Sequence, residues 1–335
     1  MKQSKLNLKH LAMFAALAGT AGVASAQSSV TISGLLNVGI AHGNNGQTQL
    51  DGTNANGKFA MNDLLSNIAF SGKEDLGGGL YAGFQLVSFI QVDNGALFDS
   101  STLFSSRSVV KFGGNFGELY MGRSLTPANL QILFTDPWGW NASSAQVGWQ
   151  IQTANYKSTS YLRTNNTVGF VSPEMGGVTV TLAHATGENV LSNDDGASID
   201  YKKGALWIGA GYDQSHGMDN NPTMNHMADL VAAYDFGVIK PMLSFTTSKV
   251  NNVTYRSYAL AATAPIGATG TLKAAYARLN DCACVAGSTA ALSKVSLGYQ
   301  YDLSKRTALF ANLSRAKAQT LSSTNTVELG IQHGF

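Results

Sequence analysis

Apolar and polar residues alternate along much of this chain, in segments of about ten residues. In residues 326–335, Val327 and Leu329 fall on one face and Glu328 on the other, and residues 292–301 repeat the pattern. A period of two is that of a β-strand. One apolar and one polar face suit strands that have lipid on one side and water on the other.

Sixteen such segments follow one another, and short turns alternate with longer polar loops between them. The expected strands are residues 30–40, 64–73, 80–91, 105–112, 118–123, 163–172, 178–185, 197–201, 205–215, 226–234, 238–249, 255–264, 271–279, 292–301, 307–316 and 326–335. An even strand number with this alternation predicts an all-β fold, a transmembrane antiparallel barrel. A soluble β-sandwich also alternates, but no internal boundary divides this chain into sandwich-sized domains.

One connection stands out by its length, because 39 residues separate two expected strands between residues 124 and 162. A segment this long without secondary structure is usually functional. In a wide barrel it would fold into the lumen and narrow the channel. Its most distinctive part contains Asp136, Trp138 and Trp140. The two tryptophans fit either of two roles, stacking against solutes or packing the loop against the wall.

The first 26 residues have the layout of a secretory signal peptide, with Lys2, Lys5 and Lys9 before a short apolar run and a small-residue cleavage site. The run is shorter than the roughly 20 residues that a membrane-spanning helix needs. We therefore expect a single barrel domain at residues 27–335, with 19 basic and 20 acidic residues. The basic balance of the whole chain comes from the leader and indicates no nucleic-acid partner.

Composition supports the barrel over a soluble fold. The chain has 36 glycines, 6 prolines and only 13% charged residues, about half the usual charged share. Cys282 and Cys284 are expected in a loop after residues 271–279, either as a local disulfide or unpaired, with no histidine at zinc spacing. No motif for a metal or a cofactor is found.

Several motifs then carry a resemblance. They are SSVTISGLLNVGI (28–40), FSGKEDLGGGLYAGFQL (70–86), LFSSRSVVKFGGNFGELYMGR (103–123), VGFVSPEMGGVTV (168–180), SLGYQYDLSKRTALFANLS (296–314) and the terminal Phe335. Together they resemble the trimeric general porins of Gram-negative outer membranes. The resemblance implies a homotrimer, an inward third loop, and passive diffusion of small hydrophilic solutes and ions. It also implies contact with outer-membrane lipid and lipopolysaccharide, and a role for Phe335 as a signal for the outer-membrane assembly machinery.

In porins of this kind, wall arginines face acidic residues on the inward loop. Arg107 and Arg163 match two of these arginines, whereas Asn67 stands where a third is usual. Asp136 is the only acidic residue between residues 124 and 162. The resemblance therefore implies a pore constriction at these four residues, and the excess of positive charge predicts a weak preference for anions.

Strand phase assigns the remaining basic residues. Arg107 alternates with Val110, so we expect it in the lumen, because an arginine on the lipid face near mid-membrane would cost roughly 2–4 kcal/mol. Arg123 has the opposite phase, which indicates a subunit interface or a loop anchor. Three lysines have lumen phase and are expected to be solvated: Lys240, Lys273 and Lys294.

Other functions remain open at this point. A substrate-specific outer-membrane channel of the same fold is one alternative, and an outer-membrane barrel enzyme or an adhesin is another. An enzyme needs a nucleophile with a nearby base. None of the histidines after the leader lies in a hydrolase motif: His42, His184, His216, His226 and His333.

Overall fold

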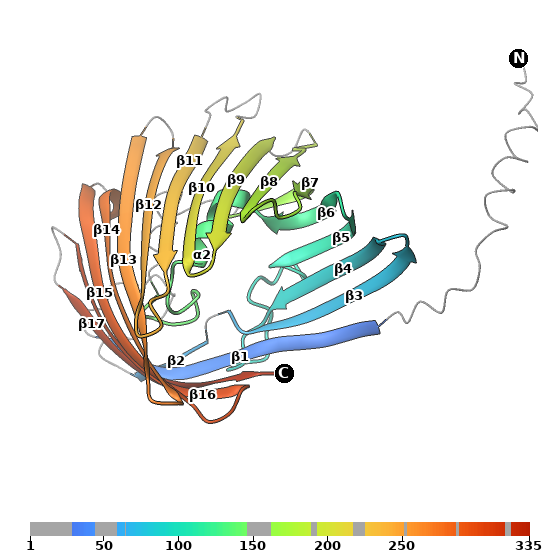
Figure 1. The fold of residues 1–335 in the computed structure, drawn as a ribbon. Coiled ribbons are helices and arrows are strands. Elements are labelled where there is room, and N and C mark those ends of the chain that lie inside the picture. The colour runs from blue at the N-terminus through green and yellow to red at the C-terminus, as the bar shows by residue number, and fades with distance from the viewer. Residues whose placement is uncertain are drawn as a thin grey trace, which may run out of the picture.

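A single antiparallel sheet contains every strand of the computed structural model (Figure 1). The structure describes residues 29–43, 59–63, 65–145, 162–188, 193–216, 225–250, 253–285, 288–318 and 323–335. The proposed signal peptide at residues 1–26 lies outside these ranges. Within them, no helix is long and apolar enough to cross a membrane.

The strands of the first half lead up to and follow the long third loop. They are β1 (Ser29–Gly43), β2 (Phe59–Asn62), β3 (Asn67–Gly77), β4 (Leu80–Phe89), β5 (Arg107–Gly114), β6 (Gly117–Leu125), β7 (Arg163–Val171) and β8 (Val178–Ala185), with helix α2 (Pro127–Leu133) between β6 and β7. The segment predicted to lack secondary structure thus contains a helix.

The second half is a run of consecutive hairpins. Its strands are β9 (Asp194–Lys203), β10 (Leu206–Ser215), β11 (Asn225–Tyr234), β12 (Lys240–Val250), β13 (Val253–Ile266), β14 (Gly270–Val285), β15 (Ser288–Asp302), β16 (Thr307–Ala318) and β17 (Thr324–Gly334). The prediction that Cys282 and Cys284 lie in a loop is wrong, because β14 continues through both. Their side chains fall outside the described part of the chain, so the disulfide prediction stays open.

Pairing of β1 with β17, from Leu35 opposite Gly334 to Gly43 opposite Thr326, closes the sheet into a barrel. The barrel has 16 strand positions because β2 and β3 share one. Residues 29–35 of β1 pair with β3, and residues 39–42 pair with β2. The predicted count of 16 is confirmed, but the second strand begins at Phe59, breaks, and resumes at Asn67 rather than starting at residue 64.

The break between β2 and β3 has a local cause. Leu65 has a positive φ of 52°, a conformation that turns the chain out of an extended strand. The Ser66 hydroxyl accepts from the Asn37 backbone nitrogen at 2.9 Å and donates to the Asn37 carbonyl oxygen at 3.1 Å. A side chain thus replaces the ladder of hydrogen bonds at this point of the wall.

The predicted alternation is confirmed by burial. On β5, Val109 is 2% exposed and its neighbour Val110 is 65% exposed. On β17, Glu328 is buried whereas Leu329 is exposed. We call the buried, polar phase inward and the exposed, apolar phase outward. The outward phase carries exposed Val, Leu, Ile and aromatic side chains on nearly every strand, as a lipid-facing surface requires.

The two ends of the barrel differ. At one end, strands are joined by short turns such as Lys203 to Leu206, where Gly204 has a φ of 59°. A positive φ suits glycine because it has no Cβ to clash. At the other end lie the longer connections, including residues 90–106 and the 126–162 segment.

Candidate functional site

Helix α2 rests against the inward face of β8, β9, β10 and β11 (Figure 1). Glycines in the wall make this approach possible. A Cβ placed on Gly211 of β10 would lie 2.6 Å from Ala128 Cα, and one on Gly196 of β9 would lie 2.6 Å from Pro127 Cδ. Pro127 starts the helix, where its missing N–H leaves no hydrogen bond unmade.

Wall acids lie beneath this helix. The Ala128 backbone nitrogen donates to the Asp213 carboxylate, 3.2 and 3.4 Å from its two oxygens. A carboxylate is stabilised at a helix N-terminus by the helix dipole. Asp229 lies next to Gly211, buried, and its carboxylate makes no hydrogen bond within the described part of the chain. The helix therefore covers two inward carboxylates.

Beyond α2 the loop is fastened by Trp138. Its side chain is buried, and its indole Nε1 donates to Asn312 Oδ1 of β16 at 2.8 Å. Gly298 of β15 provides the space, because a Cβ there would lie 2.9 Å from the same nitrogen. Asp136 is also buried and accepts from the Trp138 backbone nitrogen at 3.0 Å. Trp140, with a φ of 68°, packs against the buried apolar cluster that contains Trp138 and Trp207.

A polar anchor holds the next part of the loop. Glu328 of β17 accepts from the Ser143 backbone nitrogen at 3.2 Å, the Ser143 hydroxyl at 2.8 Å and Asn312 Nδ2 at 3.0 Å. Lys294 of β15 donates to the carbonyl oxygens of Ser143 and Ala145. Lys294 is buried, so the prediction that it is a solvated wall lysine is wrong.

These anchors come from wall positions of inward phase, on both sides of the barrel. Asn37 of β1 adds another by donating through Nδ2 to the Asn141 carbonyl oxygen. Residues 126–145 therefore lie within the ring of strands, held by α2 at one side and by the Trp138–Ala145 stretch at the other. Sequence reasoning missed these anchors, because each joins residues more than 80 positions apart.

A second part of the inward wall is basic. Arg107 of β5 has the inward phase of Val109, and its guanidinium carbon lies 5.6 Å from the Tyr120 ring centroid. Lys111 forms an ion pair with Glu118 at 2.9 Å. Lys73 of β3 lies over the Tyr81 ring at 3.9 Å. Three cations thus share β3 and β5, with Glu118 on β6 beside them.

Arg163 lies at the start of β7, apart from the inward row that contains Arg107. An irregularity in the β6–β7 register places Thr164 opposite inward Ser124, which gives Arg163 the other phase. Its Nε donates to the Ser106 carbonyl oxygen at 3.0 Å, and its guanidinium carbon lies 5.1 Å from the Phe89 ring centroid. The structure therefore ties Arg163 to the ends of β4 and β5.

The other candidate residues also have defined partners. Asn67 donates through Nδ2 to the Leu65 carbonyl oxygen at 3.0 Å, at the break between β2 and β3. Arg123 has the outward phase and links β6 to its neighbours, donating to the Ser105 carbonyl oxygen at 2.9 Å and to Asn165 Oδ1 at 2.7 Å. Phe335 exchanges backbone hydrogen bonds with Gly34 of β1.

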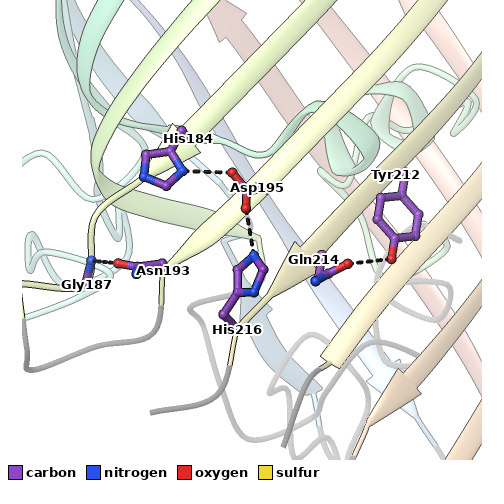
Figure 2. Close-up of polar contacts among 7 residues, drawn as sticks. All are labelled: His184, Gly187, Asn193, Asp195, Tyr212, Gln214 and His216. Atoms are coloured by element: carbon purple, nitrogen blue, oxygen red, sulfur yellow. Dashed lines mark hydrogen bonds and ion pairs between the residues drawn. The ribbon is translucent and has the colours of Figure 1, made fainter. Parts of the chain in front are cut away.

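A polar cluster that sequence reasoning did not identify lies at the long-loop ends of β8, β9 and β10. Figure 2 shows Asp195 between His184 and His216. A ring nitrogen of each histidine lies 2.7 Å from an oxygen of the Asp195 carboxylate. Asp195 alternates with inward Asp194 and Gly196, so the cluster faces outward and does not line the lumen. The cluster joins the ends of these three neighbouring strands. Beside it, in the connection from β8 to β9, Gly187 donates its backbone N–H to Asn193 Oδ1 at 2.7 Å.

Within the described residues, three ion pairs are present: Lys111–Glu118, His184–Asp195 and His216–Asp195. The structure thus brings neither Arg107 nor Arg163 into an ion pair with Asp136. No group of three or more His, Cys, Asp or Glu side chains in that part of the chain has an arrangement that fits a metal ion.

A closed antiparallel barrel with an apolar outer face, a polar inner face and a loop folded into its lumen defines a membrane channel. The chain belongs to the Gram-negative porins, whose family model matches residues 13–321. Its fold and family are those of outer-membrane channels rather than enzymes. In such barrels the short turns lie on the periplasmic side and the longer loops on the extracellular side.

Individual relatives agree with this assignment. Outer membrane porin protein 32 of Delftia acidovorans is 30% identical, over 97% of this chain and 94% of the relative. An outer membrane porin protein of Bordetella pertussis is 26% identical, over 98% of this chain and 100% of the relative. The solved anion-selective porin from Comamonas acidovorans is 28% identical with a TM-score of 0.79, covering 92% of this chain and 100% of the other.

Proposed function

We propose that this porin conducts small hydrophilic solutes and ions by passive diffusion, with a preference for anions. The observation that carries the preference is the unequal burial of inward charges. Asp229 is 3% exposed and Glu328 is 1% exposed, and Asp136 and Asp213 are buried too. Lys73 and Lys240 are exposed, whereas Lys111 and its ion-pair partner Glu118 each keep 22% of the side chain accessible and balance each other.

Burial decides which charges an ion in the channel meets. At about 4 Å and an effective dielectric constant of 20, one unit charge acts on an ion by about 4 kcal/mol, and beyond about 10 Å in 0.1 M salt the effect is largely screened. An acid beneath the loop is kept from close approach, whereas an exposed lysine is not. The permeating ion therefore meets more positive than negative charge. The anion selectivity named for the 28%-identical Comamonas porin supports the same proposal.

We assign the constriction to the space between the folded loop and the Arg107 wall. Arg107 has the inward phase, and its Nε is buried without a hydrogen bond in the described structure. Asp136 contributes as a buried loop acid, and Arg163 and Asn67 set the wall beside it. The contacts of Trp138 support a packing role rather than solute stacking.

The reversal potential across a planar bilayer with a tenfold KCl gradient tests this assignment. The wild type is expected to favour chloride, more strongly at low salt. Arg107→Gln should lower the chloride preference, and Arg163→Gln should lower it less because Arg163 lies outside the inward row. Arg256→Gln removes the same charge from the outer face and serves as the control, with no change expected. A wild-type potential of the cation-selective sign would refute the proposal.

The apolar residues of the outer surface are the basis for the partners that we propose. We assign a homotrimer whose contact uses the outward apolar residues of β1, β3–β6 and β17. Outer-membrane lipid and lipopolysaccharide cover the remaining outer face. Phe335, exposed on the outer face at the last strand, is assigned as the signal for the assembly machinery.

A further inference from the structure

One aromatic side chain of the folded loop is exposed inside the barrel. Of residues 126–145, only Phe134, which directly follows α2, is exposed, and its exposed fraction is 56%. The strands expose their large apolar side chains to lipid on the outward face, whereas Phe134 belongs to the loop within the ring of strands. Its ring is therefore accessible to a solute in the lumen.

Helix α2 brings Phe134 to the periplasmic part of the wall. The first turn of the helix packs Ala128 against Gly211, and Phe134 at the other end contacts Trp207, next to the short turn before β10. The Phe134 and Trp207 rings meet edge to face, with centroids 6.2 Å apart and an interplanar angle of 78°. Trp207 is buried, and its indole Nε1 donates to Asp200 Oδ1 at 2.7 Å. Trp207 therefore supports Phe134 from the wall side while the rest of the Phe134 ring stays exposed.

A lysine lies beside these two rings. Lys202 of β9 is directly opposite Trp207 and has the same inward phase. Its Nζ is 5.1 Å from the Trp207 ring centroid and 5.7 Å from the Phe134 ring centroid. Lys202 is exposed, and none of the three ion pairs among the described residues includes it. We refer to Phe134, Trp207 and Lys202 as the aromatic–lysine site.

Other charged residues also lie at this end of the β8–β12 wall. Glu174 and Asp235 each accept a backbone N–H at 2.8 Å within their own short turn. Asp200 is two residues from Lys202 on the inward face and accepts the indole N–H described above. Lys240 of β12 is a second exposed lysine of inward phase. Because none of these acids is paired with Lys202, a solute anion at its ammonium group replaces water rather than a protein carboxylate.

We propose that the aromatic–lysine site binds small aromatic carboxylates on the periplasmic side of the constriction. The proposal rests on the diffusion function given above and adds a class of solute to it. The ring of the solute packs on the exposed part of Phe134, since aromatic pairs attract each other at centroid distances of about 4.5–7 Å. Its carboxylate accepts a charge-assisted hydrogen bond from Lys202.

The spacing of the site limits the size of the solute. Because Lys202 Nζ is 5.7 Å from the Phe134 ring centroid, a carboxylate joined to the ring directly or through one methylene group reaches both side chains. Two exposed contacts give weak binding, which suits a channel because the solute must also leave the site. Benzoate is the simplest probe with this chemistry.

The test measures benzoate binding to the folded, detergent-solubilised protein by saturation-transfer NMR titration, which needs no ion current. Phe134→Leu keeps an apolar side chain but removes the ring, and it is expected to weaken binding about 2- to 12-fold, the range of an aromatic pair. Lys202→Gln is expected to weaken binding about 1.5- to 5-fold, as loss of an accessible ion pair does.

Two variants at the same end of the barrel serve as controls. Phe236→Leu removes a ring that is 62% exposed in the turn after β11, and Lys203→Gln removes the outward lysine next to Lys202. Both are expected to bind benzoate as the wild type does. Cyclohexanecarboxylate has the charge of benzoate without the aromatic ring, and benzamide has the ring without the charge. The wild type is expected to bind each of them more weakly than benzoate.

Equal benzoate affinity of Phe134→Leu and the wild type would overturn the proposal, as would equal affinity of the wild type for benzoate and cyclohexanecarboxylate. The reversal potential in benzoate-free KCl separates this test from that of the channel function. If the wild type favours chloride but does not bind benzoate, the site is refuted and the channel function stands. If it binds benzoate through Phe134 but has a potential of the cation-selective sign, the site stands and the anion preference is refuted.

Discussion

At the scale of single residues, carboxylates on the same inward face of the barrel differ in how they contact the folded loop that buries them. Asp213 and Asp229 both have the inward phase. Asp213 accepts the Ala128 N–H at the start of α2, whereas Asp229 is buried with no hydrogen bond in the described structure. A buried carboxylate without a partner costs free energy. Asp213 therefore stabilises the folded loop, whereas burial of Asp229 lowers the stability of the barrel.

Two matched substitutions separate these roles. Asp229→Asn is expected to stabilise the barrel by up to about 1–3 kcal/mol, because an amide of nearly the same shape costs less to bury than a carboxyl group that has no hydrogen bond. Asp213→Asn is expected to destabilise it by up to about 1 kcal/mol, because the helix N-terminus loses its negative partner. The temperature at which folded protein converts to the unfolded band in SDS gels measures both. A less stable Asp229→Asn variant, or one with an altered reversal potential, would contradict this account.

The face of the sheet on which a residue lies was predictable from the sequence, but its burial beneath the folded loop was not. Alternation alone placed Arg107 and Glu328 on the inward face and Val110 on the outward face, and the register agrees. The same reasoning took Lys294 for a solvated lysine. It lies instead beneath Ser143 and Ala145, some 150 positions earlier in the chain. A period of two reports the face of a residue and contains no information on what a distant loop lays over it.

At the scale of elements, the strands were predictable because each is specified by its own ten residues and by the turn beside it. β8 matches its predicted bounds, and most other strands differ by a few residues. The β2–β3 break and helix α2 were not predictable, since Leu65 and Ser66 carry no turn motif and α2 depends on wall glycines far along the chain.

The close packing of helix α2 against β10 gives a prediction at the scale of elements. Gly211→Ala places a methyl group 2.6 Å from Ala128 Cα, and such overpacking costs about 1–3 kcal/mol. We expect α2 to move away from β10 into the lumen, which narrows the constriction and lowers single-channel conductance, and which lowers the chloride preference as Asp213 and Asp229 become accessible. Gly72→Ala, whose Cβ would meet the Phe84 ring on the outward face, is the control. Wild-type conductance and selectivity in the Gly211 variant would show that the helix does not limit the channel.

At the scale of the whole molecule, the outer face divides into two sectors of different chemistry. The outward positions of β13–β16 pass from apolar residues through Tyr258 and Tyr276 to exposed basic residues such as Arg278 and Lys317. On β5 and β6 the outward positions remain apolar over much of the strand, with Val110 and Met121 directly opposite each other. The first sector suits lipid with charged headgroups, and the second suits another protein surface.

The second sector therefore predicts the subunit contact. Val110 and Met121 are 65% and 60% exposed in one chain, and the equally paired Leu297 and Leu313 of β15 and β16 are 55% and 53% exposed. Val110→Gln/Met121→Gln should remove the burial of two apolar side chains per subunit, each worth about 1.5–3 kcal/mol. It should therefore lower the incubation temperature at which the trimer separates into monomers on SDS gels. Leu297→Gln/Leu313→Gln changes a lipid-facing pair to the same degree and should leave that temperature nearly unchanged. A monomer mass for the wild type in mild detergent, or equal losses in the two variants, would place the contact elsewhere or remove it.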